Sequence, residues 1–126
     1  MRLITVVPTL ILIFGIASAT DNLMFARLTA FITCNGQPWD ANVEIMAAGD
    51  YETDHDHLAI VVPQNGKFDS VISRTNNPIY FLRVHSKCSK CPPIDSTFVR
   101  SNQQHWNWLT AVNNPVNLGI FETGRC

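Results

Sequence analysis

Four cysteines are the residues of this 126-residue chain whose chemistry is the most constrained by the sequence. They are Cys34, Cys88, Cys91 and Cys126, and an even number in a short chain is typical of two disulfides formed in an oxidising compartment. Three pairings are possible. If successive strands run antiparallel, the ends of the first, fifth and last strands meet at one pole, so we favour Cys34 and Cys126 each pairing with either Cys88 or Cys91.

Other chemistry is disfavoured at Cys88-x-x-Cys91. A redox dithiol needs its first thiol at a helix N-terminus, and no βαβ pattern surrounds this motif. His85 lies three residues before Cys88, which is a spacing that zinc sites use, but zinc would compete with disulfide formation outside the cell. We therefore interpret all four cysteines as structural.

The segment Asp54-His55-Asp56-His57 is the densest group of potential metal ligands. In a strand only alternate residues share a face, so at most two of these four side chains would converge. The segment also lacks the spacing of a calcium loop. We interpret it as a solvated acidic connection and predict neither a metal site nor a cofactor.

Two tryptophans, Trp106 and Trp108, lie one residue apart in a segment, 101–115, that has no clear core periodicity. Burying both would require a strand, and the flanking residues do not support its alternation. Tryptophans bring a large apolar area to a contact at little entropic cost, which makes them good anchors. The sequence therefore predicts a long loop, or a loop with a distorted strand, and we place the candidate binding residues His105, Trp106 and Trp108 on it. Packing of one or both tryptophans in the core is the alternative that stays open.

Catalysis has little support in the sequence. We find no Gly-x-Ser-x-Gly elbow, no P-loop and no zinc-protease helix, so we predict that the protein is not an enzyme. The alternative that stays open is a small hydrolase that uses a histidine as its base, the candidates being His55, His57, His85 and His105.

Residues 1–19 have the pattern of a secretory signal peptide. Arg2 is a short positive region, Leu3 to Ile16 is apolar, and Ala17-Ser18-Ala19 is a cleavage site. The apolar run is too short for a membrane span of about 20 residues. We expect a secreted chain that begins at Thr20, with no transmembrane segment and with residues 20–126 forming one domain.

That domain consists of short apolar–polar alternations separated by turn signals. Asn65-Gly66 predicts a type I′ hairpin that places Val62 and Phe68 on paired strands. Seven residues separate Cys34 from Asn42, which is long enough for the second strand to cross into another sheet. The pattern predicts an all-β antiparallel sandwich of about seven strands, near residues 25–33, 42–48, 58–62, 67–72, 79–85, 96–100 and 116–120.

Charge excludes one class of partner. The formal net charge is -1, and loss of Arg2 with the leader would leave eight basic and ten acidic side chains. No strongly basic face is expected, so nucleic acid is not a predicted partner.

Several motifs, taken in order, resemble a known family. They are Cys34-Asn35-Gly36 followed by Pro38, Asn65 to Phe68, Tyr80 to Cys88, and Asn117 to Glu122 before a terminal Cys126. In this order they resemble the secreted transthyretin-like proteins of nematodes. The resemblance implies a transthyretin-like β-sandwich that acts outside the cell as a binding or adaptor module. Its partner would be an extracellular protein or a phospholipid surface.

The same resemblance bears on catalysis. The enzymes of this fold, the 5-hydroxyisourate hydrolases, end in Tyr-Arg-Gly-Ser, whereas this chain ends in Glu122-Thr123-Gly124-Arg125-Cys126. It also has no histidine in its first strand. No catalytic residue can therefore be carried over, and a hydrolase of this type stays as the alternative function.

Overall fold

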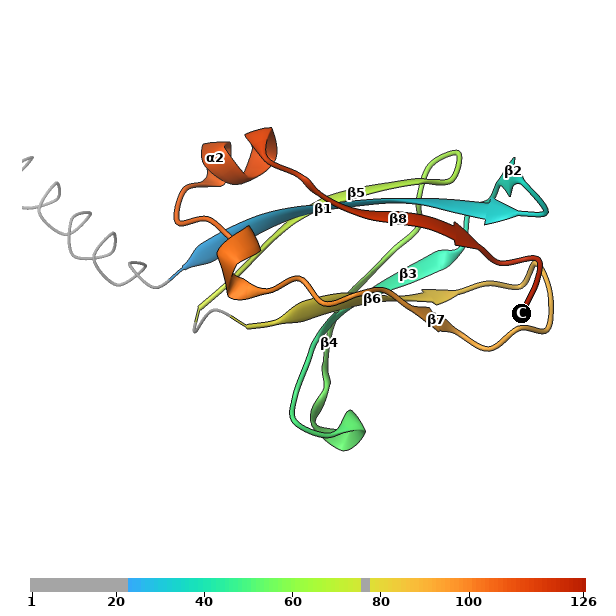
Figure 1. Ribbon diagram of the computed structural model, residues 1–126, viewed down its shortest axis with the longest axis horizontal. Coiled ribbons are helices and arrows are strands. Elements are labelled where there is room, and N and C mark those ends of the chain that lie inside the picture. Colours follow the sequence, from blue (N-terminus) through green and yellow to red (C-terminus); the bar gives the residue numbers. More distant parts are fainter. Residues whose placement is uncertain (1–22, 76–77) are drawn as a thin grey trace, which may run out of the picture.

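A computed structural model describes residues 23–75 and 78–126, which fold into two facing β-sheets (Figure 1). The predicted signal peptide at 1–19 and the predicted start of the mature chain at Thr20 lie outside the described residues. Within the described residues the structure is an all-β sandwich, as predicted.

The first sheet is built around β1 (Met24–Cys34). β5 (Lys67–Arg74) pairs with β1 in antiparallel register along its length, and β2 (Gln37–Pro38) pairs with the last two residues of β1. β8 (Val116–Glu122) runs parallel to β1 on the other side.

The second sheet has the order β4-β3-β6-β7, and all its strand pairs are antiparallel. Its strands are β4 (Asp56–Val61), β3 (Asn42–Ala47), β6 (Tyr80–His85) and β7 (Ile94–Asp95). The predicted crossing between sheets after the first strand is confirmed, because β1 and β3 lie in different sheets.

The parallel β1–β8 pair corrects the expectation of a purely antiparallel sandwich. After β7 the chain runs back to the end of the molecule where β1 begins, and it enters β8 from that end (Figure 1). β8 must therefore point in the same direction as β1.

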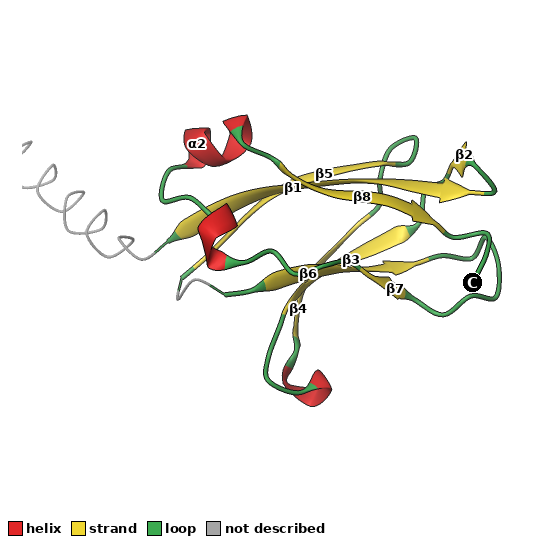
Figure 2. Ribbon diagram, in the orientation of Figure 1, coloured by secondary structure: helices red, strands yellow, loops and turns green. Residues whose placement is uncertain are grey.

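Residues 96–115 also differ from the prediction. Instead of a strand at 96–100, only Val99 pairs, through a bridge to Tyr80. Instead of a loop at 101–115, the chain forms η3 (Ser101–Gln103) and α2 (Trp108–Asn113), two of the helices in Figure 2. A further helix among the described residues, η2 (Glu52–Asp54), lies between β3 and β4.

The core lies between the sheets and follows from the alternation in β1. Even-numbered residues of β1 from Met24 to Ile32 are buried, and the odd-numbered residues between them are half-exposed. Burial of one large apolar side chain stabilises the fold by about 1.5 to 3 kcal/mol. The largest apolar side chains that are fully buried between the sheets are Leu28, Ile32, Val43, Ile45, Phe68, Tyr80, Leu82, Val84 and Val99.

The predicted turn at Asn65-Gly66 is confirmed. Both residues have positive φ, 57° and 78°, and Gln64 and Lys67 exchange two backbone hydrogen bonds across them. This is the geometry that a two-residue type I′ turn requires.

The predicted pairing beyond that turn is wrong. Val62 follows β4 in the second sheet, whereas Phe68 lies on β5 in the first sheet. Pro63 has no backbone N–H, so a hairpin ladder cannot continue past the turn. β5 instead pairs with β1 and places Phe68 in the core.

The four cysteines form two disulfides, Cys34–Cys88 and Cys91–Cys126, with Cα separations of 5.9 and 5.6 Å. Both belong to the favoured pairing, and both lie at the end of the sandwich that also holds the C-terminus (Figure 1). We call this end the disulfide pole.

Glu122 organises the backbone at the disulfide pole. Its carboxylate accepts hydrogen bonds from the backbone N–H groups of Asn35 (2.8 Å), Gly36 (2.7 Å) and Gly124 (2.6 Å). The hydroxyl of Thr33 donates a further one (3.1 Å). The Gly124 N–H, followed by those of Gly36 and Asn35, lowers the pKa of Glu122 to about 2.

Glu122 should therefore make the fold sensitive to acid. Because its pKa is lowered, its contribution is complete above the ordinary value of 4.5 and is lost as the pH falls through about 2. Glu122→Gln should be less stable than the wild type at pH 7 and should lose less stability between pH 4.5 and 2. Urea unfolding across that range is the measurement, with the exposed Asp50→Asn as a charge-matched control. Parallel curves for Glu122→Gln and the wild type would contradict the assignment.

Candidate functional site

The predicted binding residues lie at the end of the sandwich opposite the disulfides, where β1 begins (Figure 1). Trp106, Trp108 and Leu109 are 63%, 53% and 59% exposed. His105 is half-buried. We call residues 104–109 the tryptophan pole.

The backbone on the N-terminal side of the two tryptophans is held firmly. The N–H and C=O groups of His105 exchange hydrogen bonds with those of Phe25 on β1 (2.8 and 2.7 Å). The Gln104 side chain is buried and donates from Nε2 to the carbonyl of Pro78 (2.6 Å). The backbone of His105 is therefore anchored to β1, and the side chain of the next residue, Trp106, is exposed to solvent.

α2 holds the other side of the pole. Asn107 caps the helix, since its Oδ1 accepts from the N–H groups of Leu109 (2.8 Å) and Thr110 (3.2 Å). Ala111 is fully buried, and Arg27 on β1 donates to the carbonyl of Val112 (2.8 Å). The exposed rings thus project from a fixed backbone.

Two arginines lie at this end of the molecule. Arg100 lies at the start of η3, and Arg74 ends β5 opposite Met24, the first residue of β1. No acidic residue occurs between Asp95 and Glu122. The tryptophan pole therefore lacks acidic side chains of its own and lies at the same end of the molecule as Arg74 and Arg100.

A second cluster of polar residues lies on the outer face of the second sheet. Glu44 on β3 is hydrogen-bonded through Oε2 to Nδ1 of His57 (2.5 Å) and through Oε1 to Nε2 of His85 (2.8 Å). The hydrogen bond with His85 is the largest cause of the lowered pKa of Glu44. Sequence analysis proposed both histidines as possible bases but did not identify Glu44 as their partner.

The strand register keeps these two histidines apart. His57 pairs with Met46 and His85 pairs with Asn42, which are two residues to either side of Glu44 along β3. The imidazoles therefore reach the carboxylate from opposite sides of β3, one at each oxygen. In the described part of the chain, no three His, Cys, Asp or Glu side chains form a group that could hold a metal ion.

His55 is engaged elsewhere. Its Nδ1 accepts from the N–H of Gly49 (3.0 Å), its Nε2 lies 3.2 Å from Glu52, and its ring packs edge-on against Phe81. Among the described residues, no Ser, Thr or Cys side chain is hydrogen-bonded to His55, His57 or His85. The arrangement thus supplies imidazole–carboxylate pairs without an adjacent side-chain nucleophile.

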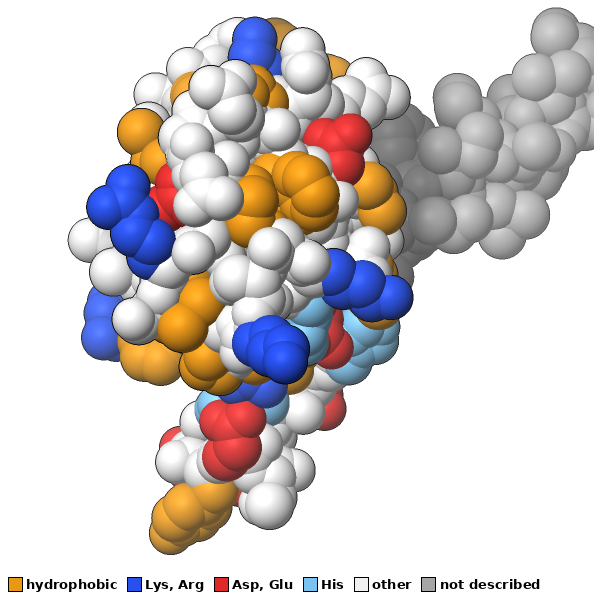
Figure 3. Space-filling model, turned by 90° about the vertical axis from the view of Figure 1, so that its right-hand side faces the viewer, with side chains coloured by type: hydrophobic (Ala, Val, Ile, Leu, Met, Phe, Trp, Pro, Cys, Tyr) orange, Lys and Arg blue, Asp and Glu red, His pale blue; other side chains and the backbone are white. Residues whose placement is uncertain are grey.

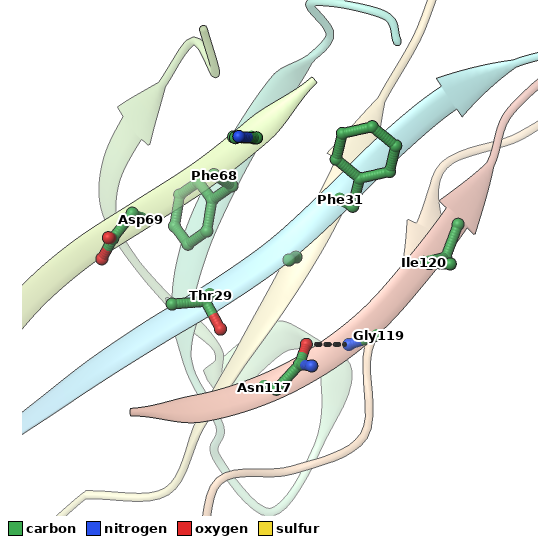
Figure 4. Close-up of a pocket in the computed structure, with 9 residues that line it drawn as sticks. Thr29, Phe31, Phe68, Asp69, Asn117, Gly119 and Ile120 are labelled. Carbon is green, nitrogen blue, oxygen red and sulfur yellow. Dashed lines mark hydrogen bonds between the residues drawn. The ribbon is translucent and has the colours of Figure 1, made fainter. Parts of the chain in front are cut away.

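A shallow hollow of about 310 Å³ lies on the outer face of the first sheet (Figure 4). It forms where the β1–β8 register shifts between Thr29 and Phe31, and where Gly119, at φ +96°, has no side chain to fill the space. Asn117 and Ile120 flank it on β8. It offers apolar contact but no converging set of acid and base groups.

The sequence carried one signal for the missed helix. Asn107 is a preferred N-cap type directly before the first helical residue. With only six residues in α2, helical periodicity was too short to outweigh the apparent loop composition.

The fold and its sites define a class: an all-β two-sheet sandwich with two disulfides at one pole and exposed aromatic side chains at the other. No family model matches the chain, and neither the curated proteins nor the solved structures contain a match. Membership of the nematode transthyretin-like family, and its exact topology, stay predictions. No helix in the described ranges is long and apolar enough to cross a membrane.

Proposed function

We propose that the protein is a secreted extracellular binding module that docks on a phospholipid surface through its tryptophan pole. The observation that carries the proposal is the exposure of Trp106 and Trp108 on a backbone that is fixed on both sides. Because this backbone is already ordered in the free protein, binding costs little conformational entropy. More of the interaction free energy therefore contributes to affinity.

Charge favours lipid over protein as the partner. Tryptophans gather at the interface between lipid headgroups and hydrocarbon, and each nearby Lys or Arg contributes about 1 kcal/mol at an anionic membrane surface. Arg74 and Arg100 lie at the same end as the tryptophans, and no acidic residue of the segment between Asp95 and Glu122 opposes them. The disulfide pole would then face away from the membrane and leave room for a second partner, as an adaptor requires.

Vesicle binding tests this proposal. Vesicles that contain phosphatidylserine should bind the protein more tightly than vesicles of phosphatidylcholine alone, and salt should weaken the difference. Trp106→Ala and Trp108→Ala should each weaken binding by about 1 to 2 kcal/mol. Their free energies of unfolding should change by less than about 1 kcal/mol, because both rings are exposed. Co-sedimentation and thermal unfolding give the two readouts.

Trp39 provides a matched control. It is 38% exposed and follows β2 at the opposite pole, so Trp39→Ala should bind vesicles like the wild type. If all three tryptophan variants lose the same vesicle affinity, or if none loses any, the tryptophan pole is not the surface that contacts the membrane. Tryptophan-dependent binding to an extracellular protein, with no vesicle binding, would replace lipid with a protein partner.

The second candidate function is a small hydrolase. The observation in its favour is the hydrogen bond of Glu44 to both His57 and His85, since a carboxylate can orient an imidazole that acts as a base. Turnover of ureide or ester substrates that disappears in His57→Ala or His85→Ala would favour the hydrolase and contradict a purely binding role.

A further inference from the structure

Tyr51 lies on a projection of the second sheet that the proposed function does not use. Residues 49–56, which we call the acidic projection, comprise most of the connection from β3 to β4 and the first residue of β4, and they extend away from the sandwich (Figure 1). Figure 3 shows acidic side chains on this projection below the body of the molecule. Tyr51 is 72% exposed, whereas Tyr80, the other tyrosine of the chain, is fully buried.

Acidic residues surround Tyr51 on both sides in the sequence. Asp50 precedes it directly, Glu52 follows it, and Asp54 and Asp56 lie three and five residues further on. All four are exposed. A modifying enzyme with a cationic groove would therefore meet one phenol hydroxyl surrounded by complementary charge.

The base of the projection is closely packed and is tied to the sheet. Gly49 packs so closely that a Cβ there would lie 2.5 Å from the Cβ of Asp54. Arg83 on β6 donates to Glu52 (2.9 Å) and ties the projection to the sheet. Tyr51 itself has extended backbone dihedrals, φ -126° and ψ 159°, so its side chain is presented outside the short η2 turn.

We propose that Tyr51 is O-sulfated during secretion. The donor is a nucleotide-activated sulfate. The phenol oxygen of Tyr51 forms a bond to sulfur, the bond between sulfur and the nucleotide phosphate breaks, the nucleotide leaves with that electron pair, and a base of the transferase takes the phenol proton. This inference rests on the secretion that the proposed function includes, because the modification takes place on the way out of the cell.

The product has a permanent negative charge at the end of an already acidic projection. Such a group accepts charge-assisted hydrogen bonds from Arg and Lys of a partner, as a phosphate does. The acidic projection would then be a second contact surface, separate from the tryptophan pole.

The test is to express the full chain, with its own leader, in a secreting animal cell line fed radiolabelled sulfate. The secreted protein should carry label and the accurate mass of one added SO3, located on Tyr51 by fragmentation. Tyr51→Phe should remove both signals, and Tyr80 should remain unmodified. Secreted protein without added SO3, label on another residue, or a phosphatase-sensitive group on Tyr51 would each overturn the inference.

Charge variants test how the transferase selects this tyrosine. Asp50→Asn and Asp54→Asn should each lower the sulfated fraction by about two- to fivefold, the range that one exposed ion pair supplies. Thr53→Ala, an exposed neighbour without charge, should leave it unchanged. Equal sulfation of all variants would overturn the role of the acidic residues.

The two proposals fail in different ways. A chain that reaches the medium unsulfated and still binds vesicles would overturn only the modification. A chain that is not secreted would overturn both proposals. A sulfated chain that does not bind vesicles would overturn only the lipid contact.

Discussion

Replacing Cys34 and Cys88 together by alanine should lower the free energy of unfolding by about 4 kcal/mol. The bond joins residues 54 positions apart, so its loss returns a large amount of conformational freedom to the unfolded chain. Domains of about a hundred residues are stable by only about 5 to 15 kcal/mol, so the loss would be a large part of the total. Urea unfolding at fixed pH measures the difference.

Reduction provides the control for this experiment. A reducing agent should destabilise the wild type by more than it destabilises the double variant, because only Cys91–Cys126 remains to be broken in the variant. Non-reducing peptide mapping should recover the same two pairs from the wild type. A double variant that unfolds at the wild-type urea concentration, or a peptide that joins Cys34 to Cys91, would contradict this assignment.

The second large effect is expected for Gly66→Ala, which should destabilise the fold by about 3 kcal/mol. Gly66 has φ +78°, which already disfavours a side chain, and a Cβ there would lie 2.6 Å from the carbonyl oxygen of Ile32. The same peptide region is held closely, since the N–H of Ile32 donates to the carbonyl of Gly66 (2.7 Å). Neither backbone can move away without breaking that hydrogen bond.

Gly36 is the matched control. Its φ of +81° is almost the same, but a Cβ there would meet nothing within 4 Å. Gly36→Ala should therefore cost only the strain of positive φ, about 1 to 2 kcal/mol. Thermal unfolding of the two variants separates the cost of backbone strain from the cost of steric overlap. Equal losses of stability in both variants would show that the close approach at Gly66 contributes nothing.

Local patterns in the sequence predicted much of the sandwich. The alternation near β1 predicted which of its residues are buried, because side chains of a strand alternate between two faces. Asn65-Gly66 predicted its turn, because both positions require positive φ. The sequence left open whether Trp106 and Trp108 are buried, and the structure shows both rings exposed.

The candidate sites were predicted less completely. Sequence analysis selected Trp106, Trp108 and His105, but the anchoring of His105 on Phe25 depends on a contact between residues 80 positions apart. Likewise, nothing in the sequence near His57 or His85 indicates that both bind Glu44. Such contacts arise only when separate strands take adjacent places in a sheet.

The amino-acid sequence by itself determined the class of the fold and the pole at which the cysteines meet. Only the tertiary structure decided that β8 joins β1 in parallel, that β4 and β5 separate into different sheets, and that a carboxylate lies between two histidines. The physical reason is range: alternation and turn preference act over a few residues, whereas strand partners are selected by burial of apolar faces between segments far apart in the chain.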